Sequence, residues 1–188
     1  MEFHKSIIEQ IKNSNEKCFI LTGSPGVGKS TYISYLKTQL EKDDIFVIRH
    51  HYYLSVESKN EKRYRYFDIK NSLLEQINNI SSVKFSNNDE LEKVLNEFSR
   101  HFKDKLIIII IDGLDHVWRD IGKKDDLDTL FNNLFPLPNN IKLLVGTQPI
   151  DSEKLPYKLL DIEREKWFML PFMSLESIKN YLVHDNRI

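Results

Sequence analysis

Hydrophobic residues in this chain gather in short continuous runs, and the longer segments between the runs carry them at every third or fourth position. Continuous apolar runs of this length are typical of strands buried on both faces of a parallel sheet. Spacings of three and four are typical of helices with one apolar side. Strands that alternate with helices predict a three-layer α/β fold, with a mostly parallel five-stranded sheet and helices on both faces. The runs lie at 18–21, 45–48, 106–111, 141–145 and 167–170.

Six segments show the helical spacing. Asp68 and Ser174 stand where the side chain of an N-cap residue is expected. The aromatic and charged segment 49–65 has no clean period, which predicts an irregular excursion after the second strand. The helices are expected around 7–11 and at 31–40, 68–80, 91–102, 127–134 and 174–183.

The composition narrows the class of protein. The 188 residues suffice for a single domain, 1–188, around one core. With 27 Lys and Arg against 28 Asp and Glu, the net charge is −1, so no overall basic field indicates a nucleic-acid partner. The longest apolar run, 106–111, is far shorter than the roughly 20 residues that span a bilayer. We expect a cytoplasmic protein without a membrane or nucleic-acid partner, and the lone Cys18 as a buried strand residue.

The strongest chemical signal is the sequence GSPGVGKS at residues 23–30, which fits the pattern G-x-x-x-x-G-K-[ST] between an apolar run and a helix. Glycines let consecutive backbone N–H groups turn toward an anion, and the N-terminus of the helix adds a positive dipole. Lys29 is expected at the β- and γ-phosphates and Ser30 as a ligand of Mg²⁺; the alternative is a plain glycine turn. We therefore expect ATP (or ADP) with Mg²⁺ as cofactors, held by Gly23, Ser24, Pro25, Gly26, Val27, Gly28, Lys29, Ser30 and Thr31.

Two acids follow the most apolar run. Asp112 comes directly after 106–111, and Asp115 follows three residues later. The end of a buried strand is where an acid can reach a metal ion on a neighbouring phosphate loop, so Asp112 is expected to support Mg²⁺ directly or through water. Asp115 is the candidate that orients or deprotonates the attacking water. The alternative for Asp112 is a cap on a turn.

Polar side chains also end the fourth and second runs. Gln148 is expected to read the γ-phosphate, with Thr147 close behind; an amide can hydrogen-bond a phosphate oxygen but cannot neutralise it. The alternative is a turn stopped by Pro149. His50 and His51 have no Cys or carboxylate at the spacing of a zinc site, so we expect packing or switch contacts from them.

The phosphate loop together with the strand end IIIIIDGLDH resembles the STAND class of P-loop NTPases, in particular its NACHT-like branch and the bacterial antiviral STAND ATPases. The resemblance covers nearly the whole chain. It implies that the strand 141–145 lies between the phosphate-loop strand and the strand that ends at Asp112. It also implies an ATP-driven switch that self-associates within a larger defence protein, with a C-terminal sensor beyond this chain that binds a phage protein as trigger.

Two positions depart from the patterns of related ATPases. His116 stands where many NACHT sequences have Glu after the second acid. Gly113 stands where many hydrolytic AAA-type ATPases carry the catalytic Glu. These departures predict slow hydrolysis, which suits a switch held by its nucleotide better than a motor.

Two other classes of function stay open. A phosphate loop in a chain of this length also suits a kinase for nucleosides or nucleotides, but the one candidate for an arginine-rich lid, 161–166, holds three acids and two bases. The other alternative is an interaction module that binds nucleotide and does not turn it over.

Overall fold

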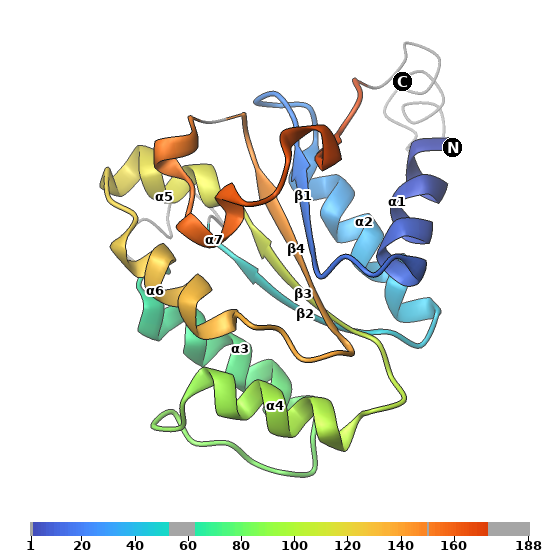
Figure 1. Ribbon diagram of the computed structural model, residues 1–188, viewed down its shortest axis with the longest axis vertical. Helices are drawn as coiled ribbons and strands as arrows, with labels where there is room; N and C mark the ends of the chain where they lie inside the picture. Colours follow the sequence, from blue (N-terminus) through green and yellow to red (C-terminus); the bar gives the residue numbers. More distant parts are fainter. Residues whose placement is uncertain (1, 53–62, 150, 173–188) are drawn as a thin grey trace, which may run out of the picture.

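The five strands form one sheet in which every described neighbour pair is parallel. The computed structural model describes residues 2–52, 63–149 and 151–172. The strand order is β2-β3-β4-β1-β5, so β4 lies between β1 and β3 as the resemblance implied (Figure 1). The predicted fold class, a parallel five-stranded α/β P-loop fold, is therefore confirmed. The strands are β1 (Cys18–Thr22), β2 (Phe46–His51), β3 (Ile107–Asp112), β4 (Ile141–Thr147) and β5 (Phe168–Met169).

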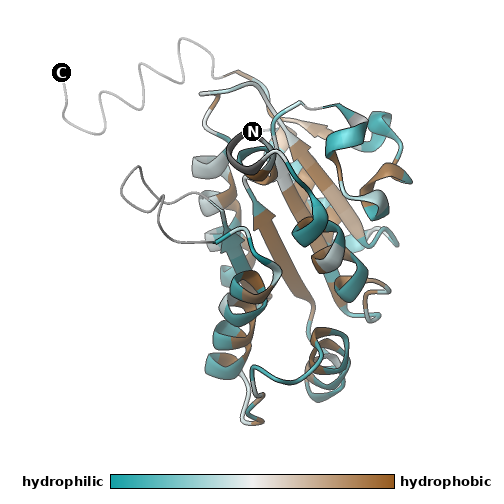
Figure 2. Ribbon diagram, turned by 90° about the vertical axis from the view of Figure 1, so that its left-hand side faces the viewer, coloured by the Kyte–Doolittle hydropathy of each residue, from teal (hydrophilic) through white to brown (hydrophobic). Residues whose placement is uncertain are grey.

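Helices cover both faces of this sheet (Figures 1 and 2). Helices α1 and α2 form one hydrophobic cluster with Ile108, Ile110 and Leu144 of the sheet. Helices α3, α4, α5 and α6 form a second cluster on the other face, with the strand residues Ile107, Ile109, Ile111, Leu143 and Val145. The strand period of two therefore sends successive isoleucines of β3 into opposite cores. The helices are α1 (Glu2–Asn13), α2 (Lys29–Lys42), α3 (Tyr66–Ile80), α4 (Leu91–His101), α5 (Leu114–Ile121), α6 (Asp125–Leu134) and α7 (Tyr157–Leu160), with 3₁₀ turns at Ser152–Lys154 and Arg164–Lys166.

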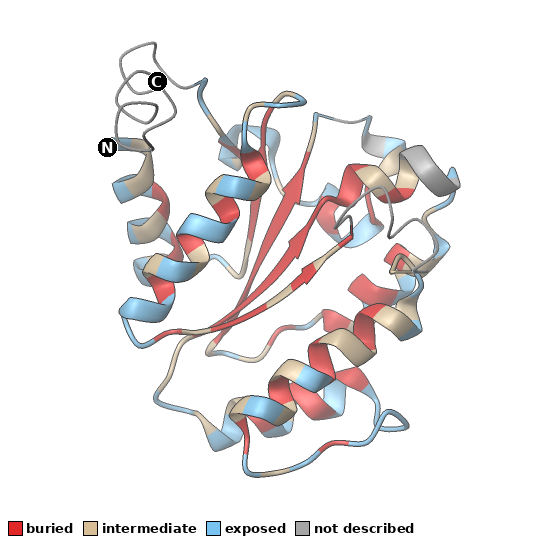
Figure 3. Cartoon of the chain, turned by 180° about the vertical axis from the view of Figure 1, so that it is seen from behind, coloured by how far each residue is buried: buried red, intermediate tan, exposed pale blue. Residues whose placement is uncertain are grey.

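The central strands are buried along their whole length. All residues of β3 and β4 are buried, and Figure 3 shows the middle of the sheet in red between partly exposed helices. The register pairs His51 with Asp112, Asp112 with Gly146, and Gly146 with Leu21. One row across the sheet thus joins the carboxyl ends of four strands, the edge at which open α/β sheets bind ligands.

Several expected boundaries are corrected by tertiary contacts. Strand β2 continues to His51, so the expected irregular segment does not begin at Arg49. Helix α3 begins at Tyr66, and Asp68 lies in its first turn and is not the N-cap. The carboxylate of Asp126 accepts a hydrogen bond from the Tyr66 N–H at 2.9 Å, so α6 supplies the cap that local sequence did not indicate. The helix expected at 174–183 lies outside the described residues.

Two further expectations concern Cys18 and membranes. Cys18 lies in β1 and is half-buried, and burial raises the pKa of its thiol to about 12, which disfavours the reactive thiolate. Among the described residues, no helix combines the length and the hydrophobicity that crossing a membrane requires.

Candidate nucleotide-binding site

The phosphate loop is the tight turn that joins β1 to α2. Gly26 and Gly28 have positive φ angles of 76° and 90°, which L side chains rarely adopt, so glycine is required at both positions. A Cβ on Gly23 would lie 2.9 Å from Cγ1 of Val27, which shows how closely the loop folds back on itself. Helix α2 begins at Lys29 directly after Gly28, and no side chain caps this end. Its first N–H groups and positive dipole are therefore available to an anion.

The residues of the phosphate loop differ in exposure. Lys29 is buried, with 9% of its surface exposed, and Ser30 is half-buried beside it on the first turn of α2. Pro25, Gly26, Gly28 and Thr31 are exposed, and Gly23, Ser24 and Val27 are buried or half-buried. The structure brings the predicted phosphate-binding residues together in one turn, and their contacts with a nucleotide stay a prediction.

Asp112 is the buried acid of the site. It ends β3 with no exposed surface, and its Oδ2 lies 2.6 Å from Nη2 of Arg49 and 2.9 Å from Nδ1 of His51. Burial alone would raise the pKa of Asp112, but the adjacent His51 and Arg49 outweigh it and hold the pKa below its ordinary value. Asp112 is therefore a carboxylate near neutral pH.

The donor set fits a magnesium ion that is shared with phosphate. The Oδ1 atom of Asp112 is buried without a hydrogen-bond partner. Ser30 lies on the first turn of α2, and Arg49 links this turn to Asp112 because it bonds both the Ser30 carbonyl and the Asp112 carboxylate. Carboxylate and hydroxyl oxygens are hard ligands, and Mg²⁺ is commonly held by one or two of them together with substrate phosphates. Within the described ranges, no group of three or more His, Cys, Asp or Glu side chains forms a metal site by itself.

Asp115 connects the acid segment to the end of β4. It lies in the first turn of α5, is 6% exposed, and its Oδ1 accepts a hydrogen bond from the backbone N–H of Gln148 at 3.0 Å. Its Oδ2 has no hydrogen-bond partner, and Nε2 of His116 lies 3.9 Å away. The Thr147 hydroxyl donates to the Gln148 carbonyl, and the contact of the Gln148 side chain with the γ-phosphate stays a prediction.

Helix α5 and the contacts of Arg49 are features that the sequence analysis missed. Arg49 donates to Oγ of Ser34 at 2.6 Å and to the carbonyl of Ser30 at 3.4 Å, besides its ion pair with Asp112. Its backbone N–H and C=O are both bonded by the side-chain amide of Gln76, which occupies this part of the edge of β2. The available signal was spacing: Arg49 and His51 are two residues apart, so a strand that included both would place them on one face.

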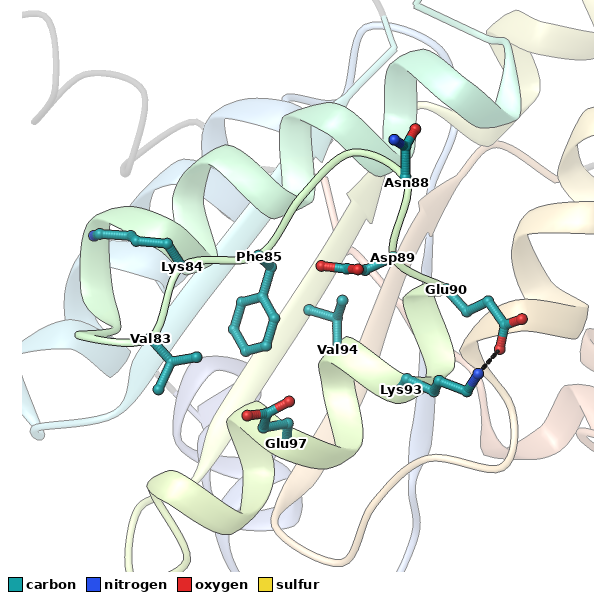
Figure 4. A pocket seen from close by; sticks show the side chains of 9 residues that line it. All are labelled: Val83, Lys84, Phe85, Asn88, Asp89, Glu90, Lys93, Val94 and Glu97. Atoms are coloured by element: carbon teal, nitrogen blue, oxygen red, sulfur yellow. Dashed lines mark ion pairs between the residues drawn. The ribbon is translucent and has the colours of Figure 1, made fainter.

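A separate hollow is lined by residues of α4 and of the connection that precedes it, and in Figure 1 α4 lies at the opposite end of the ribbon from the turn between β1 and α2. Its lining mixes Lys84 and Lys93 with Asp89, Glu90 and Glu97, and Lys93 pairs with Glu90 at 2.9 Å (Figure 4). It shares no residue with the site around Asp112.

Comparisons with known proteins support the same fold. The structure resembles the Orc1 protein of Aeropyrum pernix in complex with DNA, with a TM-score of 0.59 and 14% identity over 99% of this chain and 47% of that one. It also resembles Cdc6p from Pyrobaculum aerophilum, with a TM-score of 0.51 and 16% identity over 98% of this chain and 48% of that one. The chain thus spans about half the length of these proteins, and identities this low show the fold alone.

The Orc1 structure is a complex with DNA, which is a property of that protein; for this chain, the expectation that nucleic acid is not a partner stays a prediction. No curated protein sequence matches the chain. A sequence profile for the AAA domain matches residues 11–152, which include the phosphate loop, both acids and Gln148. With this match over most of its length, the chain belongs to the AAA domain family of P-loop NTPases.

Proposed function

We propose that this AAA domain is an ATP-binding switch that hydrolyses its nucleotide slowly. The observation that carries the proposal is the uncapped N-terminus of α2, which has the buried Lys29 on its first turn. Arg49 links Asp112 to the same turn, because it bonds both the Asp112 carboxylate and the Ser30 carbonyl. Lys29 and the N–H groups of the loop bind the β- and γ-phosphates. Ser30 and Asp112 would hold Mg²⁺, which neutralises phosphate charge when it is bound.

Slow turnover follows from the groups around the attacking water. Gly113 offers no carboxylate at the position where many AAA-type ATPases carry one, so Asp115 is the remaining base. One oxygen of Asp115 already accepts the Gln148 N–H. In this proposal the side chain of the same residue, Gln148, contacts the γ-phosphate. A change in Gln148 when the γ-phosphate is lost would therefore reach Asp115 and α5 through the hydrogen bond from the Gln148 N–H.

The wider role that we propose is that of a STAND-type defence protein. Its support is the strand end IIIIIDGLDH together with the phosphate loop. In this proposal the ATP-bound domain self-associates in the cytoplasm, and a phage protein bound by a C-terminal sensor of the full-length protein releases the switch.

Replacing Lys29 with Ala is expected to lower the affinity for ATP at least about a hundredfold, because the buried ammonium group supplies charge-assisted hydrogen bonds to the phosphates. The measurement is titration calorimetry with ATP and ADP in the presence of Mg²⁺. The matched control is Lys37→Ala, which removes a charge from the same helix where Lys37 pairs with Glu41 at 2.7 Å.

Two further measurements on the same samples distinguish a switch from a kinase. They are the rate of phosphate release and the transfer of the phosphoryl group to a panel of acceptors. Tight binding with slow phosphate release supports the switch. Absence of ATP and ADP binding by the unmodified chain contradicts the proposal. Rapid transfer of a phosphoryl group to a nucleoside would instead identify a kinase. In the candidate lid, Lys166 already pairs with Glu163 at 3.4 Å and with Glu16 at 3.8 Å, which does not favour this alternative.

A further inference from the structure

The guanidinium group of Arg49 lies between the two elements that would hold the metal ion. It bonds the carboxylate of Asp112 on β3 and, through Ser30 and Ser34, the first turns of α2. The side chain is only 16% exposed, and its Nε atom is buried without a hydrogen-bond partner. The side-chain amide of Gln76 bonds both the backbone N–H and the backbone carbonyl of Arg49, so the position of the Arg49 backbone is fixed.

This contact changes the charge that a divalent cation would meet. An isolated Asp112 would present a full negative charge in a buried site, where electrostatic interactions are strong. The guanidinium is always protonated and already matches that charge at 2.6 Å. A magnesium ion held at the free Oδ1 of Asp112 would therefore gain less attraction from this carboxylate than from an unpaired one, because Arg49 and His51 already contact it.

We propose that Arg49 acts as a resident cation at the metal acid, so that the domain binds nucleotide with little dependence on Mg²⁺. The inference rests on the proposed nucleotide binding and concerns a positioning residue: Arg49 acts through Asp112 and through the charge of the site. In this proposal the guanidinium group, which is bonded to the Ser30 carbonyl on the first turn of α2, supplies positive charge to the phosphate site that a metal ion would otherwise bring. Because the guanidinium group stays protonated, the site keeps this charge when free Mg²⁺ is scarce.

The first test uses the protein without nucleotide. Thermal unfolding is followed while MgCl₂ is added to the unmodified chain, to Arg49→Gln and to the control Lys37→Gln. We expect Mg²⁺ to leave the melting temperature of the unmodified chain and the control unchanged, and to raise that of Arg49→Gln, whose buried Asp112 carboxylate loses the guanidinium and keeps its contact with His51. Equal responses of the unmodified chain and Arg49→Gln would overturn the proposal.

The second test compares ATP affinities with Mg²⁺ and with EDTA. In the unmodified chain the two dissociation constants are expected to agree within about threefold, and in Arg49→Gln to differ at least about tenfold. Arg49→Lys, which keeps the charge, is expected to behave like the unmodified chain. Strict dependence on Mg²⁺ in the unmodified chain would refute the resident cation, and this measurement does not require any variant to fold. Absence of ATP binding under both conditions would contradict the proposed function, while the MgCl₂ titration would still decide the role of Arg49.

Discussion

Replacing Gly146 with Val is expected to lower the free energy of unfolding by about 4 kcal/mol and to abolish nucleotide binding. A Cβ at this position would lie 2.6 Å from Oδ1 of Asp112 and 2.6 Å from Cδ1 of Ile33. The carboxylate is held by Arg49 and His51 and cannot move away without losing these partners. The variant would therefore disturb the buried acid and the first turns of α2 together.

Urea unfolding of the unmodified chain, Gly146→Ala and Gly146→Val measures the stability, and calorimetry with ATP measures the site. We expect the loss of stability to increase from Ala to Val. The double variant Gly146→Ala with Ile33→Val trims the flexible neighbour only, so it should recover part of the stability while the crowding of Asp112 persists. A Gly146→Val chain as stable as the unmodified one would show that β4 can shift away from Asp112.

Most of the sheet was predictable because strands buried on both faces leave continuous apolar runs. The run at 106–111 and the observed β3 differ by one residue at each end. Helix α5 was not predictable in the same way, since it has eight residues and its limits are set by Gly113 and Gly122 at positive φ. The start of α3 was displaced because its cap comes from Asp126, which is distant in sequence.

The candidate site shows the same division. The phosphate loop is local, so spacing and residue type were enough to indicate it. The partners of Asp112 come from β2, and only the pairing of His51 with Asp112 across the sheet brings Arg49 within reach. A motif read along the chain identifies the acid but not the cation that neutralises it.

The stability of the domain is expected to fall as the pH is lowered from 7 to 4, because His50 is buried on β2. Its side chain lies against the ring of Tyr52, with 5.0 Å between ring centroids, and Nε2 lies 2.9 Å from the carbonyl of Arg63. Burial lowers the pKa of His50 to about 4; the bond to the Arg63 carbonyl opposes this shift, and the charges of Arg63 and His51 add to it.

The sign of the effect follows from which state takes up the proton. Below pH 6.5 the histidine of the unfolded chain becomes protonated, whereas the folded chain resists protonation until about pH 4. His50 thus contributes stability that is fully present above pH 6.5 and is lost toward pH 4, with a total of about 3 kcal/mol. The pKa of Asp112 lies below its ordinary value, so its carboxylate stays charged through this window.

Urea unfolding at a series of pH values tests this expectation on the unmodified chain and on His50→Gln, whose amide can still donate to the Arg63 carbonyl. The variant should lose about 3 kcal/mol less stability between pH 7 and pH 4 than the unmodified chain. His101→Gln is the matched control, because it replaces an exposed histidine at the end of α4 with the same residue. Parallel profiles for the unmodified chain and His50→Gln would mean that the folded protein accepts a proton on His50 without cost, so that burial of the His50 ring beside Tyr52 does not determine the titration of this histidine.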